Sequence, residues 1–364
     1  MARICLFGLI SKHPGRNRGG AGISMGRLAE YFIEQGHAVD IVMRRPSGEP
    51  APLAHLADTA QLLFVDQPQK LRLFFDLLRI VRRRRPDVVL AFDTRANQVA
   101  SWLMLVPGMR ARVWLSLRNL VARKHRRMLR SACARCEGVI AISQGLADHF
   151  LRLTSADAGK VHVIHNPAVT PGLADLAAET LDDPWLGPDQ PPVIVAVGRL
   201  TEQKDFPTLI RAFAALRAAR PCRLMIIGQG ELLEALEELC GELGVADHVR
   251  FCGFQPNPWK YMRSASVFVL SSAWEGFGNV VAEALSLGVP VVSTDCPYGP
   301  REILHDGRLG RLVPVGEPAA LAEAIADTLD DPPPPEPLIA GGLRFTRDAS
   351  GAQYLRLLLA KDPG

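Results

Sequence analysis

Residues 193–206 read Val193-Ile-Val-Ala-Val-Gly-Arg-Leu-Thr-Glu-Gln-Lys-Asp-Phe206, and this stretch decides the fold. It opens with five apolar residues without polar alternation, which is typical of a strand covered on both faces. A short polar loop follows, and from Phe206 to Ala219 apolar residues recur at helical spacing. A buried strand followed by such a helix is the repeating unit of a doubly wound α/β domain with a parallel sheet.

The same unit repeats along the 364 residues on both sides of this stretch. Twelve further apolar runs predict strands, at 4–9, 38–43, 61–65, 87–91, 112–117, 138–142, 161–164, 223–227, 249–252, 267–270, 289–293 and 310–313. Six prolines from Pro167 to Pro192, with no long apolar run among them, predict a linker at 171–192. We therefore expect two α/β domains, at 1–170 and 193–344, each with its own core.

The composition is that of a folded soluble protein, with 48% hydrophobic and 22% charged residues. No apolar run approaches the roughly 20 residues that cross a bilayer, and the apolar N-terminus is too short for a signal peptide. The spacing of the seven cysteines suggests no disulfide framework, which fits a reducing compartment. We therefore expect a cytoplasmic protein.

The net charge of +4 is unevenly distributed along the chain. Residues 1–170 carry 26 Lys and Arg against 12 Asp and Glu, whereas residues 171–364 carry 16 against 26. Much of the excess lies in Arg82–Arg85 and Arg118–Arg130. A basic half attracts nucleic acid, an anionic membrane or a phosphorylated acceptor, and a solvated arginine-rich surface is the alternative. No nucleic acid is expected, because aromatic residues are only 6% and no recognition motif is present.

Two loops carry the candidate chemistry, and both follow predicted strands at the edge where such sheets bind ligands. In the first loop, Gly198 permits close backbone approach, and Arg199 and Lys204 can clamp a diphosphate. Taken alone, that pair is equally typical of a solvated loop. The second loop runs from Glu275 to Glu283 and turns into a helix.

The tight turn of the second loop comprises Gly276, Phe277, Gly278 and Asn279. The first N–H groups of the helix lack acceptors within it, so they can bind an anion or a hydroxyl group. Glu275 and Glu283 then present two carboxylates to a ligand above the helix. For Glu283 alone, an acidic residue near the positive end of a helix is the alternative.

The spacing Glu275-x7-Glu283, with Gly198-Arg199-Leu200 and Lys204 upstream, resembles the large retaining glycosyltransferase group called family four. Other matching segments are Gly19-Gly20, Gly228-Gln229-Gly230, residues 249–254 and residues 288–292. The resemblance covers nearly the whole chain. It implies the GT-B fold, in which two Rossmann-like domains face each other across a cleft. It also implies a C-terminal helix at about 345–364 that packs back on the first, acceptor-binding domain.

The resemblance further implies that Arg199 and Lys204 hold the diphosphate of a nucleotide-sugar donor and stabilise the charge that grows on it. Glu275 would contact the donor sugar and Glu283 the ribose. The other implied donor-binding residues are Gly19, Gly20, Gly198, Gly253, Phe254, Gly276, Phe277, Gly278 and Asn279. No metal or other cofactor is expected, since the two cations take the place of an ion. The leaving phosphate would accept the acceptor's proton on the same face, which gives retention.

Two departures from the family pattern bear on the acceptor. Arg118-Asn119 stands where many relatives have His-Asp, and His165-Asn166-Pro167 stands where many have Asn-Gly. These features resemble a subgroup that acts on polysaccharide or lipid-linked intermediates of bacterial envelopes. Arg118, Asn119 and Asp93 are then acceptor-side candidates, although a helix cap is the preferred interpretation of Asp93.

The expected partners are a donor, which the subgroup suggests is UDP-linked, and a glycan or polyprenyl-diphosphate-linked acceptor. The predicted helix at 69–82 has an apolar face and ends in arginines, so it can rest on the anionic inner face of the cell membrane. An ordinary helix packed on the core is the alternative. A sugar-nucleotide epimerase on the same fold is the alternative activity.

Overall fold

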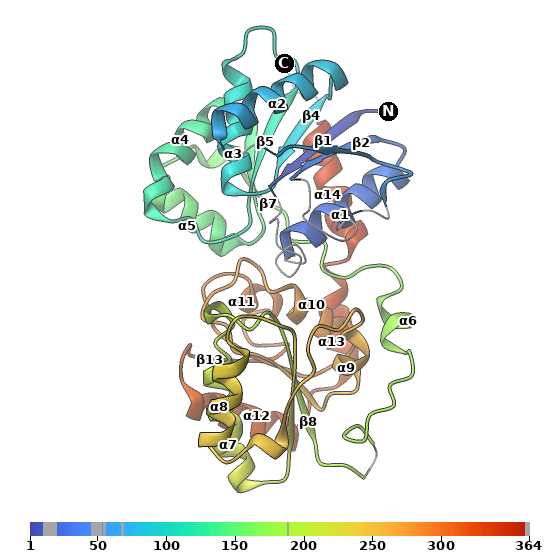
Figure 1. Ribbon diagram of the computed structural model, residues 1–364, viewed down its shortest axis with the longest axis vertical. Coiled ribbons are helices and arrows are strands. Elements are labelled where there is room, and N and C mark those ends of the chain that lie inside the picture. Colours follow the sequence, from blue (N-terminus) through green and yellow to red (C-terminus); the bar gives the residue numbers. More distant parts are fainter. Residues whose placement is uncertain (10–19, 45–52, 54–55, 67–68, 188, 361–364) are drawn as a thin grey trace. The chain divides into compact units, whose positions relative to one another are not determined.

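The computed structural model describes residues 1–9, 20–44, 53, 56–66, 69–187 and 189–360. The chain forms two compact units (Figure 1). The first comprises Met1–Pro167 and Arg347–Gly364, and the second comprises Ala168–Thr346. The C-terminal segment therefore belongs to the same unit as the N-terminus.

The first unit contains a parallel sheet whose described strands follow the order β3-β2-β1-β4-β5-β6-β7. The strands are β1 Arg3–Gly8, β2 Ala38–Met43, β3 Gln61–Phe64, β4 Val88–Ala91, β5 Arg112–Leu117, β6 Gly138–Ala141 and β7 Val161–Val163. The helices are α1 Gly20–Glu34, α2 Lys70–Arg84, α3 Thr94–Ser101, η3 Trp102–Leu105, η4 Arg123–His125, α4 Arg126–Arg135, α5 Gln144–Thr154, η5 Ala158–Lys160 and α14 Arg347–Leu359.

The second unit contains another parallel sheet, in the order β10-β9-β8-β11-β12-β13. The strands are β8 Val193–Val197, β9 Arg223–Ile227, β10 Val249–Phe251, β11 Val267–Leu270, β12 Val291–Thr294 and β13 Arg311–Val313. The helices are α6 Leu173–Ala177, η6 Glu202–Lys204, α7 Phe206–Ala219, α8 Leu233–Glu242, η7 Ala246–His248, α9 Trp259–Arg263, α10 Asn279–Ser286, α11 Pro300–Ile303, α12 Pro318–Asp330 and α13 Pro335–Leu343.

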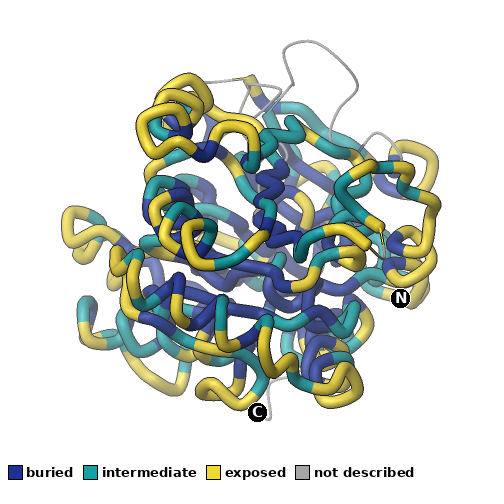
Figure 2. Tube along the Cα trace, turned by 90° about the horizontal axis from the view of Figure 1, so that it is seen from below, coloured by how far each residue is buried: buried dark blue, intermediate teal, exposed yellow. Residues whose placement is uncertain are grey.

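Every predicted apolar run overlaps a strand, and the predicted fold of two doubly wound parallel sheets is confirmed. The strands are continuous runs of apolar residues because helices cover both faces of each sheet. In Figure 2, buried, dark blue stretches of the trace alternate with exposed, yellow ones. Strand order reverses between β1 and β4 in the first sheet and between β8 and β11 in the second. Ligands of open α/β sheets bind at such reversals, beyond the carboxyl ends of the strands.

Residues 171–192, predicted as a linker, belong to the second unit, and the described part of this segment packs against the rest of that unit. In this segment, the centroid of the Trp185 ring lies 4.0 Å from Cζ of the Arg250 guanidinium. Arg250 also forms an ion pair with Asp183 at 2.7 Å. Asn257 donates a hydrogen bond from Nδ2 to the Leu176 carbonyl oxygen at 2.7 Å. Proline-rich composition therefore marks an irregular segment here, while an aromatic ring and ion pairs hold it in place.

Helix α14 packs on the first unit, and Figure 1 shows it in red beside α1. Arg347, at its first position, forms an ion pair with Glu34 of α1 at 2.5 Å. At its other end, Arg112 of β5 donates hydrogen bonds to the carbonyl oxygens of Leu358 and Ala360, both at 2.6 Å. Charged contacts thus attach both ends of α14 to the first unit.

Candidate functional site

The carboxyl ends of β8 and β11 meet at the strand-order reversal of the second sheet, and an ion pair joins them. Lys204, in η6 after β8, donates from Nζ to Oε1 of Glu275, after β11, at 2.5 Å. The two side chains are only 15% and 9% exposed. Coulombic attraction is stronger in such a partly desolvated position than in water. The sequence-predicted cation and carboxylate therefore come together as one unit.

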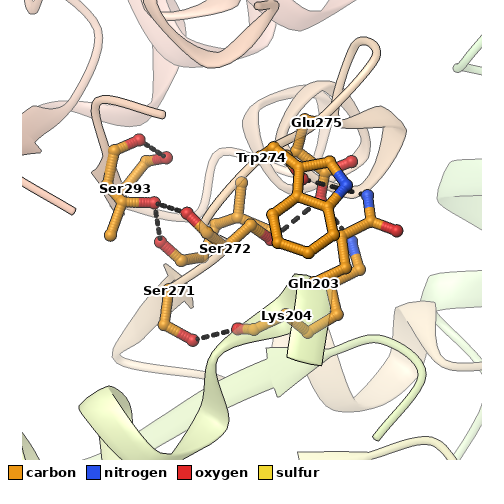
Figure 3. Close-up of polar contacts among 9 residues, drawn as sticks. Gln203, Lys204, Ser271, Ser272, Trp274, Glu275 and Ser293 are labelled. Carbon is orange, nitrogen blue, oxygen red and sulfur yellow. Dashed lines mark hydrogen bonds and ion pairs between the residues drawn. The ribbon is translucent and has the colours of Figure 1, made fainter. Parts of the chain in front are cut away.

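Serine hydroxyl groups hold both members of this pair (Figure 3). Ser272 donates from Oγ to the same Glu275 oxygen at 2.8 Å, and Ser271 donates to the Lys204 carbonyl oxygen at 2.7 Å. Thr294, at the end of β12, donates to the Ser272 carbonyl oxygen at 2.7 Å. Among the described residues, no donor reaches Oε2 of Glu275. One carboxylate oxygen is thus engaged, while the other can accept a hydrogen bond from a ligand.

Two glycines explain how the Lys204 loop lies so close to its neighbours. A Cβ at Gly198 would lie 3.1 Å from Cε of Lys204, whose side chain crosses this position. Gly228, after β9, has φ of 146°, and a Cβ there would lie 1.8 Å from the Gly198 carbonyl oxygen. Only glycine allows this approach of one backbone to another. The Gly228-Gln229-Gly230 turn therefore supports the loop that carries Lys204.

Cys296, after β12, also lies close to the ion pair. Burial, followed by the charge of Glu275, raises the pKa of the Cys296 thiol to about 12. The thiol therefore stays protonated at neutral pH. No thiolate therefore competes with Glu275 for the Lys204 ammonium group.

Arg199 lies in the same loop but does not join the ion pair. Its side chain is exposed and makes no hydrogen bond or ion pair with any described residue. It follows Gly198 directly, at the carboxyl end of β8. The loop thus offers one cation held by a carboxylate and a second cation that is solvated.

The second loop turns into α10 as the glycine pattern predicts. Gly278 has φ of 96° and precedes Asn279, the first residue of α10. Phe277 is 2% exposed and packs edge-on against Phe345, with ring centroids 5.2 Å apart. The Phe277 ring therefore anchors the turn before α10.

Glu283 lies on the second turn of α10 and is 7% exposed. Trp259 of α9 donates from Nε1 to Oε2 of Glu283 at 3.1 Å. A buried carboxylate requires such a donor, because an unpaired one would be costly. On the loop after β10, Gly253 has φ of 64° and Phe254 is 39% exposed.

The acceptor-side candidates lie in the first unit, where Asp93 caps a helix. Its Oδ1 accepts hydrogen bonds from the backbone N–H groups of Arg95 and Ala96, at the start of α3. Its Oδ2 accepts from the backbone N–H of Leu9 at 2.6 Å, which ties the ends of β1 and β4 together. Asn119 is exposed. Gly20 begins α1, and Gly19 lies outside the described residues.

Arg118 is buried, with 6% exposure. Its guanidinium donates to Asn166 Oδ1 at 2.8 Å and lies 4.4 Å from the centroid of the Phe92 ring. Its Nε has no partner among the described residues, and burial lowers the pKa of the guanidinium. Tyr354 of α14 lies 3.5 Å away, so Arg118 helps to hold that helix.

Sequence reasoning missed Trp259, Ser271, Ser272 and Thr294. The two serines directly follow a predicted strand, and this position was the only available signal for them. Nothing local marks Trp259 or Thr294, because their partners lie on other elements.

Two features of the described residues bear on metal and membrane binding. They contain no group of three or more His, Cys, Asp or Glu side chains placed to hold a metal ion. None of their helices combines the length and apolar character needed to span a bilayer.

Two family models match the chain, one for each half. The model described as Glycosyltransferase Family 4 matches residues 18–170, and the model described as Glycosyl transferases group 1 matches residues 178–343. The chain is 30% identical over 290 residues to the lipopolysaccharide core biosynthesis glycosyltransferase LpsE of Rhizobium meliloti, and the match covers 78% of each chain.

Another relative is the N-acetylgalactosamine-N,N'-diacetylbacillosaminyl-diphospho-undecaprenol 4-alpha-N-acetylgalactosaminyltransferase of Campylobacter jejuni. It is 32% identical over 189 residues, which make up 52% of this chain and 50% of the relative. The chain spans half or less of the length of three of its first curated relatives.

Among solved structures, Alr3699/HepE of Anabaena, in complex with UDP and glucose, is similar with a TM-score of 0.80 and 20% identity. The match covers 99% of this chain and all of the other. At this identity the likeness shows the shared fold, which is GT-B.

Proposed function

This chain belongs to glycosyltransferase family 4, and from that premise we propose that it transfers a sugar from a UDP-linked donor with retention of anomeric configuration. The acceptor is a glycan or a lipid-linked saccharide of a bacterial envelope. The main support for the donor site is the Lys204–Glu275 ion pair at the strand-order reversal of the second sheet. The names of the R. meliloti and C. jejuni relatives support the acceptor class.

In the proposed reaction, the bond between the anomeric carbon and the β-phosphate oxygen breaks as the acceptor oxygen bonds to that carbon. The leaving phosphate takes the acceptor's proton on the same face. Lys204 stabilises the negative charge that develops on the diphosphate, because its ion pair with Glu275 already holds it in place before the reaction. Arg199 adds a second cation from the same loop. Oε2 of Glu275 accepts a hydrogen bond from a sugar hydroxyl, while Oε1 accepts one from Lys204 and so orients the ammonium group.

The rest of the donor contacts the turn and the helix after β11. Backbone N–H groups around Phe277 and Asn279 bind the sugar and its phosphate, as helix N-termini do for anions. Glu283 accepts the ribose hydroxyls, and Trp259 keeps its carboxylate oriented. Phe254 offers an exposed ring against which the base stacks.

The chain works, in this proposal, at the cytoplasmic face of the membrane, where the first unit binds the acceptor. The apolar face of α2 packs on the core through Leu73, Leu77, Leu78 and Val81, so that face is not available to lipid. Leu71 and Phe75 of α2 remain 61% and 53% exposed beside basic residues. Flotation with anionic liposomes at low salt tests this association, because screening is weakest there. Absence of the protein from the floating fraction would exclude it.

The deciding experiment is to measure thermal unfolding with a panel of nucleoside diphosphates and their sugars. A ligand at about 100 times its Kd stabilises the bound state by about 2.7 kcal/mol. The stabilising donor is then incubated with lipid-linked acceptors, and NMR of the product reports the anomeric configuration. Inversion at the anomeric carbon would contradict the mechanism. Conversion of the donor to its epimer in the absence of acceptor would show that the protein is an epimerase instead.

Because two side-chain cations stabilise the leaving group in this proposal, EDTA is expected to leave the transfer rate unchanged. The rate is measured with and without added Mg²⁺ or Mn²⁺ after chelation. Loss of activity that a divalent ion restores would show that the cations do not suffice.

A further inference from the structure

A basic cavity of about 600 Å³ lies in the first unit. Its lining residues are Arg123, Lys124, Arg126, Arg127, Arg152 and Leu153. The five cationic side chains are exposed, and none of them makes an ion pair or hydrogen bond with a described residue. Like charges that share a hollow without a counter-ion attract anions strongly.

The position of these residues on α4 increases the positive potential. Arg126 and Arg127 are the first residues of α4, where the helix dipole already places partial positive charge. The first turn contains no acidic residue, and the N-cap residue, His125, makes no side-chain capping hydrogen bond. Cations at this end destabilise the helix slightly, so their presence is not explained by folding stability.

The other arginine cluster has an ordinary structural explanation. Arg82, Arg83 and Arg84 lie in the last turn of α2, where cations favour the helix dipole. Arg84 also forms an ion pair with the buried Asp40 at 2.7 Å. The arginines at the end of α2 therefore stabilise the fold, whereas those at the start of α4 do not, and a bound anion would explain their presence.

We propose that this cavity is a second anion site, and that it binds the diphosphate group of the acceptor. A diphosphate concentrates several negative charges in one compact group, and arginine and lysine both bind such oxygens. The cavity volume falls within the usual range for ligand sites, about 300–1,000 Å³. The assignment to a lipid-linked acceptor rests on the proposed function, whereas the anion site itself does not.

The test compares wild-type protein with two matched triple variants in calorimetric titrations with inorganic diphosphate, in the presence of UDP that occupies the proposed donor site at Arg199 and Lys204. The cavity variant carries Arg126→Gln, Arg127→Gln and Arg152→Gln. The control carries Arg110→Gln, Arg211→Gln and Arg356→Gln, three exposed arginines that lie outside both the cavity and α2 and whose replacement removes the same total charge. At about 0.15 M salt the screening length is about 8 Å, so charges outside the cavity contribute little.

The cavity variant is expected to bind diphosphate at least about tenfold more weakly than wild type, and the control to bind it as wild type does. Equal affinity in all three proteins, or equal loss in both variants, would overturn the site. Far-UV circular dichroism checks folding. UDP binding measured on the same samples separates this result from the donor proposal, because the cavity variant should bind UDP unchanged.

A second arm identifies the source of the diphosphate. Neutral phosphatidylcholine vesicles are prepared with and without polyprenyl diphosphate, and binding is measured by flotation. Wild type and control are expected to float only with the doped vesicles, and the cavity variant is expected not to float. If wild type binds inorganic diphosphate through the cavity but ignores doped vesicles, the lipid-linked acceptor is excluded and a soluble phosphorylated ligand takes its place.

Discussion

Lys204 and Glu275 partner each other, and each also has a proposed role toward the donor. We expect Lys204→Ala and Glu275→Ala each to lower kcat by about 10²–10³-fold, the usual cost of removing a preorganised electrostatic group. Initial rates with the identified donor measure this, and Glu238→Ala on the exposed face of α8 is the matched control. Near-normal turnover of either variant would remove the pair from the mechanism.

Trp259 donates its indole N–H to Glu283, the proposed partner of the ribose. The loss of nucleotide affinity on replacing Trp259 should therefore depend on the ribose hydroxyls. Trp259→Phe keeps an aromatic ring but removes the donor. A hydrogen bond to a charged group contributes about 1.5–3 kcal/mol, so UDP affinity should fall roughly 10- to 100-fold. Calorimetry with UDP and 2′-deoxy-UDP tests the assignment. The loss should be smaller with the deoxynucleotide, and an equal loss with both would place Glu283 away from the 2′-hydroxyl.

At the scale of elements, the loops after β8 and β9 pack backbone against backbone. We expect Gly228→Ala to destabilise the protein by at least about 3 kcal/mol, because its Cβ would overlap the Gly198 carbonyl oxygen. Gly241→Ala is the control, since nothing lies within 4 Å of that position in α8. It should be neutral or stabilise by up to about 1 kcal/mol. Urea unfolding measures both, and similar midpoints for the two variants would contradict the close packing.

At the scale of the molecule, the first unit is discontinuous in sequence and depends on α14. A chain ending at Thr346 loses the fully buried Tyr354 and Leu358, whose burial contributes about 1.5–3 kcal/mol each. We expect limited proteolysis to cut residues 1–167 rapidly while residues 168–346 stay protected. A chain ending at Ala360 is the control. Equal protection of both units in the shorter chain would show that the first unit folds without α14.

The local pattern of the sequence was sufficient for the elements. Short, continuous Val, Ile and Leu runs bounded by turn residues favour strands covered on both faces, and all thirteen predicted runs overlap strands. The tight turn into α10 was equally local, because Gly278 adopts a positive φ that few other residues tolerate. The proline-rich stretch at 171–192 was less informative, since composition shows irregular backbone but not the ion pair and ring contacts that pack it.

What the sequence by itself determined, then, are properties of neighbouring residues: periodicity, turn conformation and the residue types in each loop. The tertiary structure alone decided which atoms meet. Lys204 and Glu275 are 71 positions apart, and Trp259 and Glu283 are 24 apart. It also decided that Asp93 caps a helix and that Arg118 is buried against α14. The physical reason is that strand order in a parallel sheet differs from chain order, so the contacts at a strand-order reversal exist only after the sheet has assembled.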